Sequence, residues 1–115
     1  MANIVPVAAQ KLFGTVRRTE VLKALALLEE TYARELARVL DAPLITIQRL
    51  VDDLEREGIV ATRLIGKERR VTFNPRFFAR ADLQTLLLRL SQDDDRLANA
   101  VSALRKRPRK KGKAL

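Results

Sequence analysis

The segment from residue 32 to residue 73 constrains the fold of this chain more than any other part. Apolar side chains recur there at helical spacing in two runs, which predicts a helix over about 33–40 and a longer helix from 44 to about 57. Asp41 lies between the runs, and aspartate tolerates the left-handed backbone that a tight turn needs. Pro43 fits the first position of the second helix. The order is therefore helix, short turn, helix.

A β-hairpin is predicted next, after Gly58, which is placed to end the second helix. Gly66 stands at the first central position of the sequence Ile-Gly-Lys-Glu, as in a type II′ two-residue turn. In that register Arg63 lies opposite Arg70, and like charges across a strand pair destabilise it slightly. A phosphate that bound both arginines would explain them, and a solvated face is the alternative. The other face is predicted to join the core through Val60, Thr62, Leu64, Val71 and Phe73.

The flanking regions are read from caps and apolar spacing. Thr15 or Thr19 is expected to cap a first helix, after an N-terminal basic arm or extension over 1–14. We expect a domain over 15–78 with Phe73, Phe77 and Phe78 in its core. It is followed by C-terminal helices over 79–104, of which one covers 82–90 and a second start is capped by Ser91. Residues 105–115 are expected to form a disordered basic tail.

The net charge of +9 favours a polyanionic partner. The tail from Arg105 to Lys113 holds seven lysines and arginines and no acid, so subtracting its charge from +9 leaves +2 for residues 1–104. A length of 115 residues fits one small domain, and a hydrophobic content of 47% is enough for a core built from aliphatic side chains. The tail is expected to contact nucleic acid without reading its sequence.

Several classes of function are excluded or disfavoured by residue type. The chain has no Cys and no His, which excludes disulfides, zinc–thiolate sites and a histidine general base. No catalytic group of residues is visible, so we expect neither an enzyme nor a cofactor. The acidic run 93–95 is interpreted as a helix N-terminus and not as a metal site, because consecutive helical residues do not converge on one ion. Arg89 interrupts the longest leucine run, so we expect no segment that crosses a membrane. A cytoplasmic, nucleoid-associated protein is therefore expected.

Over residues 12–75 the chain resembles winged-helix transcription regulators of the ArsR/MarR type. The matching strings are LFGTVRRTEVLKALALL, RELARVL, TIQRLVDDLEREGIV and TRLIGKERRVTFNP. The resemblance implies a mainly α fold with a small β-hairpin, that is, a winged helix-turn-helix with a C-terminal helical segment. It also implies a sequence-specific regulator of transcription, expected to be a repressor, that binds double-stranded DNA.

The resemblance places the N-terminal half of the helix over 44–57 in the major groove of DNA. Gln48 and Arg49 have the chemistry to read adenine and guanine, and Thr46 can reach a phosphate or a thymine methyl group. The candidate DNA-binding residues are Leu44, Ile45, Thr46, Gln48 and Arg49 in this helix, Arg63, Lys67, Arg69 and Arg70 in the wing, Arg17 and Arg18 near the N-terminus, and Arg105, Lys106, Arg107, Arg109, Lys110, Lys111 and Lys113 in the tail.

The chain departs from the family pattern in three respects. Leu44 and Ile45 are apolar where the family usually has polar residues, and residues 44–58 sum to a charge of −2. The Cys and His ligands of the metal-sensing members are absent.

A homodimer through residues 83–104 is expected, since such regulators bind paired half-sites. The alternative is a winged-helix protein-interaction module, or an architectural nucleic-acid-binding protein with little sequence specificity, in which Leu44 and Ile45 dock a partner.

Overall fold

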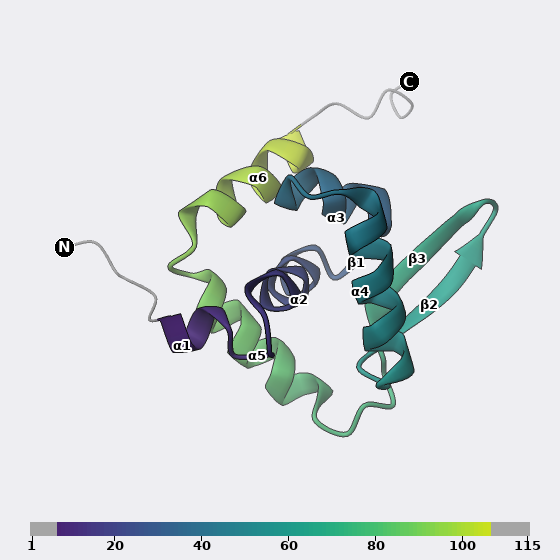
Figure 1. Ribbon diagram of the computed structural model, residues 1–115, viewed down its shortest axis with the longest axis horizontal. Coiled ribbons are helices and arrows are strands. Elements are labelled where there is room, and N and C mark those ends of the chain that lie inside the picture. The colour runs from purple at the N-terminus through teal and green to yellow at the C-terminus, as the bar shows by residue number, and fades with distance from the viewer. Residues whose placement is uncertain (1–6, 107–115) are drawn as a thin grey trace.

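Helix α2 (Val16–Leu28) lies at the centre of the molecule, with the other elements arranged around it (Figure 1). The computed structural model describes residues 7–106. The Thr15 side chain caps α2 by accepting a hydrogen bond from the backbone N–H of Arg18 at 3.0 Å, so the first of the two expected caps is confirmed. The other elements are α1 (Val7–Gln10), β1 (Glu30–Tyr32), α3 (Ala33–Leu40), α4 (Leu44–Arg56), β2 (Val60–Ile65), β3 (Glu68–Phe73), α5 (Arg80–Ser91) and α6 (Asp95–Lys106).

A single cluster of buried apolar side chains joins these elements. All six consecutive residues from Val21 to Ala26 are buried, so α2 contacts neighbours on every side instead of along one stripe. The cluster includes Leu36, Ile47, Val51, Leu54, Val60, Val71 and Phe73, together with Leu87, Leu97 and Val101 from the two last helices. Helices α5 and α6 therefore contribute to the same core as the segment resembling a winged helix.

The two helices predicted from apolar spacing are present, and α3 has the expected bounds. Asp41 has φ 53°, the left-handed conformation expected for the turn. Pro43 precedes the helix instead of occupying its first position, because its ψ of 138° is extended, and α4 begins at Leu44. Gly58, with φ 80°, ends the helix as predicted.

The β-hairpin has the predicted register, with Val60 opposite Phe73 and Arg63 opposite Arg70. Gly66 has φ 63° at the turn, the positive φ that a type II′ turn needs at its first central position. The sheet also contains β1, which pairs antiparallel with β3 and places Thr31 opposite Val71. The strand order is β1-β3-β2. The short strand β1 was not predicted, because three residues are too few to show an alternating pattern.

Two side chains predicted to lie in the core are exposed. Leu64 is 70% exposed, because the end of the hairpin extends past the helices and has nothing to pack against (Figure 1). Phe78 is 94% exposed in the loop before α5 and contacts Phe77 at 5.2 Å between ring centroids. Phe73 is buried as predicted.

The junction between the last two helices differs from the prediction. Ser91 is the last residue of α5, and its hydroxyl donates to the Leu87 carbonyl at 2.7 Å, so it does not cap α6. Asp94 is the cap, because its Oδ1 accepts a hydrogen bond from the Leu97 N–H at 3.0 Å. Helix α6 continues to Lys106 and so includes the first two residues of the expected tail. Residues 107–115 lie outside the described residues.

A buried ion pair joins the central helix to α6. The Nζ atom of Lys23 lies 2.6 Å from Oδ2 of Asp94, and the two side chains are 7% and 24% exposed. A buried ammonium is costly unless it is paired, so this contact fixes the position of the α6 N-terminus against α2. Burial alone would raise the pKa of Asp94, but hydrogen bonds from Lys23 and from the Leu97 N–H outweigh burial and lower it.

We predict that Asp94→Asn destabilises the protein by about 3 kcal/mol at pH 7, the lower end of the range for breaking a buried pair, because Asp94 keeps some exposure. Asparagine still offers an oxygen to cap α6, so the variant isolates the charge. Urea unfolding measures the change in the free energy of unfolding. A change below about 0.5 kcal/mol, as at ordinary surface sites, would contradict the structural role of the pair.

The pH dependence of this loss follows from the lowered pKa of Asp94. A carboxylate whose folded-state pKa is lowered stabilises the protein above its unfolded-state pKa of about 3.9, and this contribution is lost as the pH falls through the folded-state value. The wild-type chain should therefore lose stability more steeply than Asp94→Asn below about pH 4. Parallel stability curves for the two proteins would contradict this expectation.

Candidate nucleic-acid interface

Helix α4 presents two different halves to solvent. Ile47, Val51 and Leu54 are buried, and this spacing turns the side chains between them outward. In the first half Ile45, Gln48 and Arg49 are exposed, whereas Leu44 and Thr46 are half-buried. In the second half, and at the residue directly after the helix, the exposed side chains are charged and mostly acidic: Asp52, Asp53, Arg56 and Glu57.

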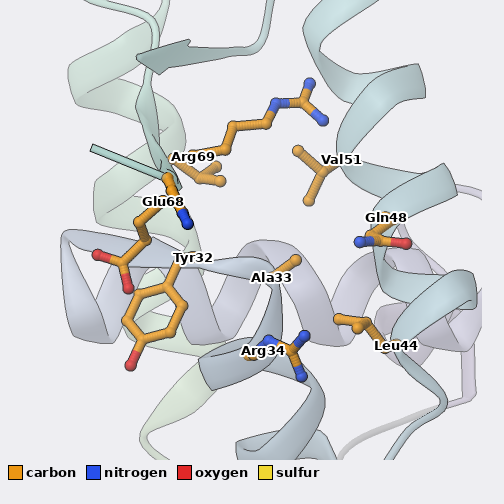
Figure 2. A pocket seen from close by; sticks show the side chains of 10 residues that line it. Tyr32, Ala33, Arg34, Leu44, Gln48, Val51, Glu68 and Arg69 are labelled. Carbon is orange, nitrogen blue, oxygen red and sulfur yellow. The ribbon is translucent and has the colours of Figure 1, made fainter. Parts of the chain in front are cut away.

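A groove of about 540 Å³ separates the first half of α4 from the β2–β3 hairpin (Figure 2). Its apolar surface includes Val51 and Val71, and Gln48 points into it from α4. The other lining residues come from α4, from the junction of β1 with α3 and from the hairpin: Leu44, Tyr32, Ala33, Arg34, Lys67, Glu68 and Arg69. The groove thus brings three cationic side chains close to the exposed polar face of α4.

Arg69 connects the hairpin to α4 across this groove. Its Nη1 lies 2.7 Å from Oδ1 of Asp52 and its Nη2 lies 2.7 Å from Oε1 of Glu55. The Thr62 hydroxyl donates a further hydrogen bond to Oε2 of Glu55 at 2.5 Å. The hydrogen bond from Thr62, with the Arg69 contacts, lowers the pKa of Glu55, and the hydrogen bond to Asp52 raises the pKa of Arg69.

These contacts give the acidic half of α4 a structural role. Asp52 and Glu55 bind a hairpin arginine, and Asp53 pairs with Arg56 at 3.1 Å on the same helix. The excess of acidic residues over 44–58, noted as a departure from the family pattern, is therefore partly neutralised by neighbouring cations. Arg69, predicted as a wing contact to DNA, is already engaged by these carboxylates.

Arg70 is also engaged within the sheet. Its Nε is buried and forms no hydrogen bond with a described residue, but it lies 3.1 Å from Glu68 and 3.6 Å from Glu30, and its guanidinium lies 5.3 Å from the centroid of the Tyr32 ring. The two acids and the ring offset the repulsion between Arg70 and Arg63. The facing arginines therefore do not require a bound phosphate.

Arg17 and Arg18 make contacts inside the fold as well. Arg17 pairs with Glu20 at 3.3 Å and donates to the Leu40 carbonyl at 3.4 Å, which joins α2 to the end of α3. Arg18 makes a two-pronged contact with Glu57 after α4, in which its Nη1 donates to Oε2 at 3.3 Å. Hydrogen bonding from Arg18 lowers the pKa of Glu57. The charges of both arginines are thus partly compensated.

Four cations of α3, α4 and the hairpin have no ion pair with any described residue: Arg34, Arg49, Arg63 and Lys67. Arg49, Arg63 and Lys67 were predicted as site residues, and all three are exposed. Arg34 was missed, although its spacing of four from Arg38, on the outer side of the predicted 33–40 helix, was a signal for it. Arg105 and Lys106 fall at the end of α6, whereas Arg107, Arg109, Lys110, Lys111 and Lys113 lie outside the described residues.

This arrangement is suited to holding an anion. Arginine and lysine side chains without acidic partners bind phosphate oxygens, and an exposed glutamine beside them supplies both a donor and an acceptor.

Within residues 7–106 no helix has both the length and the apolar character needed to cross a membrane.

We predict that Arg69→Gln loosens the hairpin. Both ion pairs of Arg69 are partly exposed, so the free energy of unfolding should fall by only about 1 kcal/mol. Amide hydrogen exchange in β2 and β3 should become faster, because the link to α4 is lost. The matched control is Arg63→Gln, which removes an equal charge from the same hairpin without breaking a described ion pair. Equal effects of the two substitutions would contradict the link.

Comparison of the chain with protein-family models, with curated proteins and with solved structures found no match. No relative therefore supplies a function for this protein. Its function has to be inferred from the geometry of α4, the groove and the hairpin, and from the resemblance carried by the sequence motifs.

Proposed function

We propose that this protein is a winged-helix regulator of transcription that binds double-stranded DNA, with α4 as the recognition helix and the β2–β3 hairpin as the wing. The observation that carries the proposal is the exposed pair Gln48 and Arg49 on α4, beside the unpaired cations Arg34 and Lys67 at the groove. Side chains that read bases and side chains that hold phosphates are thus adjacent on one surface.

The proposed binding mode assigns a different task to each part of this surface. The first half of α4 enters the major groove, where Gln48 pairs with adenine and Arg49 with guanine. Thr46 is half-buried at the start of the helix and reaches a phosphate or a thymine methyl group. Lys67 and Arg63 from the wing, and Arg34 from α3, bind the DNA backbone.

The contacts of Arg69 support this mode. A recognition helix needs a fixed angle to its wing if both are to contact DNA at the same time, and pre-formed geometry lowers the cost of binding. Arg69 holds Asp52 and Glu55 on α4, so these carboxylates fix the wing and are less repulsive to DNA than free acids. In this proposal Arg69 positions the wing.

A homodimer on paired half-sites is part of the proposal, as is the cytoplasmic, nucleoid-associated location. The core uses more of the C-terminal leucines than expected, since Leu87 is buried and Leu83 and Leu90 are half-buried. Leu86 and Leu88 are the α5 leucines left exposed, at 41% and 43%. They remain available for contact with a second copy of the chain. The two side chains lie on opposite sides of the buried Leu87 on the helix surface.

One observation favours the alternative of a protein-interaction or architectural module. Ile45 is 55% exposed at the start of α4, and an aliphatic side chain there suits a protein partner as well as thymine methyl groups. Selection of bound sites from random duplex DNA separates the two proposals. An enriched inverted repeat supports the dimeric regulator, whereas tight binding without enrichment supports the architectural module.

We predict that Arg49→Ala weakens binding to the selected duplex by about 1–3 kcal/mol and relaxes specificity at one base position. The control is Arg89→Ala on α5, which removes the same charge away from the groove and should change affinity little. Fluorescence anisotropy with the selected duplex and with a random duplex measures both effects. Equal weakening on the two duplexes would show that Arg49 does not read a base.

We predict that deleting residues 107–115 reduces affinity for all duplexes. The deletion removes five cations but leaves α6 intact. Each phosphate contact contributes about 0.9 to the slope of log affinity against log salt, so the slope should become shallower by several times that amount. Binding to a random duplex across a range of salt concentrations measures the slope. An unchanged slope would exclude the tail from DNA binding.

A further inference from the structure

The tip of the β2–β3 hairpin carries two large aliphatic side chains in solvent. Leu64 is 70% exposed and Ile65 is 47% exposed, directly before the turn at Gly66. Neither belongs to the core cluster or packs against it. Adjacent residues of a strand point to opposite faces, so each face of the tip carries one aliphatic side chain, with Arg69 opposite Leu64 and Glu68 opposite Ile65. Fold stability does not explain these residues, since aliphatic side chains gain stability from burial.

Unpaired positive charges flank this apolar tip. Arg63 precedes Leu64, Lys67 follows the turn glycine, and neither has an ion pair with another described residue. The only acid at the tip, Glu68, lies 3.1 Å from Nε of Arg70. An apolar end between free cations is complementary to a partner that is polyanionic outside and apolar inside. Stacked base pairs between phosphate backbones have this character.

The hairpin is anchored to α4 close to its tip, since Arg69 lies directly opposite Leu64. Arg69 contacts Asp52 and Glu55 on α4, and Thr62 donates a hydrogen bond to Glu55. Beyond Arg69 the turn of the hairpin extends away from the helices (Figure 1). A side chain can separate stacked bases only if its support resists the force, and these anchors provide that support.

We propose that Leu64 and Ile65 form an apolar wedge that enters the minor groove of double-stranded DNA, partly unstacks a base step and bends the duplex. This inference rests on the proposed DNA-binding function, and it adds an activity, deformation of DNA, to the reading of bases by α4. Burial of the two side chains between bases offsets part of the cost of unstacking, while Arg63 and Lys67 bind the phosphates on either side. Flexible pyrimidine–purine steps should be preferred, because they kink at the lowest cost.

The test measures bending directly. The duplex is roughly three helical turns long, which leaves room for about one wedge site and its flanks, and it has a TA step at its centre. It carries a donor dye at one end and an acceptor dye at the other. Saturation with the wild-type protein should raise energy transfer by an amount that corresponds to a bend of about 20° or more. A bisbenzimide dye that occupies the minor groove beforehand should abolish this increase.

The variant Leu64→Thr with Ile65→Thr removes the wedge, keeps the net charge and places β-branched residues, which suit a strand, at both positions. It should still bind, with an unchanged dependence on salt, and should lose at least half of the increase in energy transfer. Phe78→Gln, which removes an exposed apolar side chain from the loop before α5, should bend DNA like the wild-type protein. Circular dichroism confirms that each variant is folded.

The outcomes separate this inference from the proposed function. Wild-type binding without bending, or full bending by the double variant, overturns the wedge and leaves DNA binding intact. Bending that persists when the minor groove is occupied also overturns it. Absence of any DNA binding by the wild-type protein overturns the wedge and the proposed function together.

Discussion

Burial of α2 on all sides is the constraint on which the rest of the structure depends. A helix with one apolar stripe needs one neighbour, but six consecutive buried residues from Val21 to Ala26 need neighbours all around them. Helices α3 and α4, the sheet and the last two helices supply them. The outward face of α4 is a consequence of this arrangement, because its buried side is fixed by contact with the central helix. Lys23, buried on α2, is then paired with Asp94 alone among the described residues, and this contact fixes the start of α6.

The charges of the protein are divided between internal and external use. Arg18, Arg69 and Arg70 bind acids of other elements or of their own sheet. Arg34, Arg49, Arg63 and Lys67 are left without such partners among the described residues, and they gather around the groove and the hairpin. A count of basic residues would therefore overestimate the charge that is available to a polyanion. The distribution of the unpaired cations locates the proposed interface better than the total does.

The parts of the structure that follow from local chemistry were predictable from the sequence. Gly66 and the two-residue turn set the hairpin register, Asp41 and Gly58 marked the helix ends, and apolar spacing gave α3 and α4. Contacts between distant residues were not predictable in this way. Arg18 meets Glu57 across 39 positions and Arg69 meets Asp52 across 17, so these arginines looked free in the sequence. Leu64 alternates like a core residue, but the pattern does not say where the helices beneath the hairpin end.

The contact between Lys23 and Asp94 spans 71 positions, and this separation has a consequence for the order of assembly. During synthesis the central helix leaves the ribosome long before the segment that neutralises its ammonium. Until then the nascent chain carries a cation at a site that only becomes favourable to bury once α6 arrives. Burial of the Lys23 ammonium with its charge neutralised therefore requires a contact between residues 71 positions apart, and contacts of such long sequence separation slow folding.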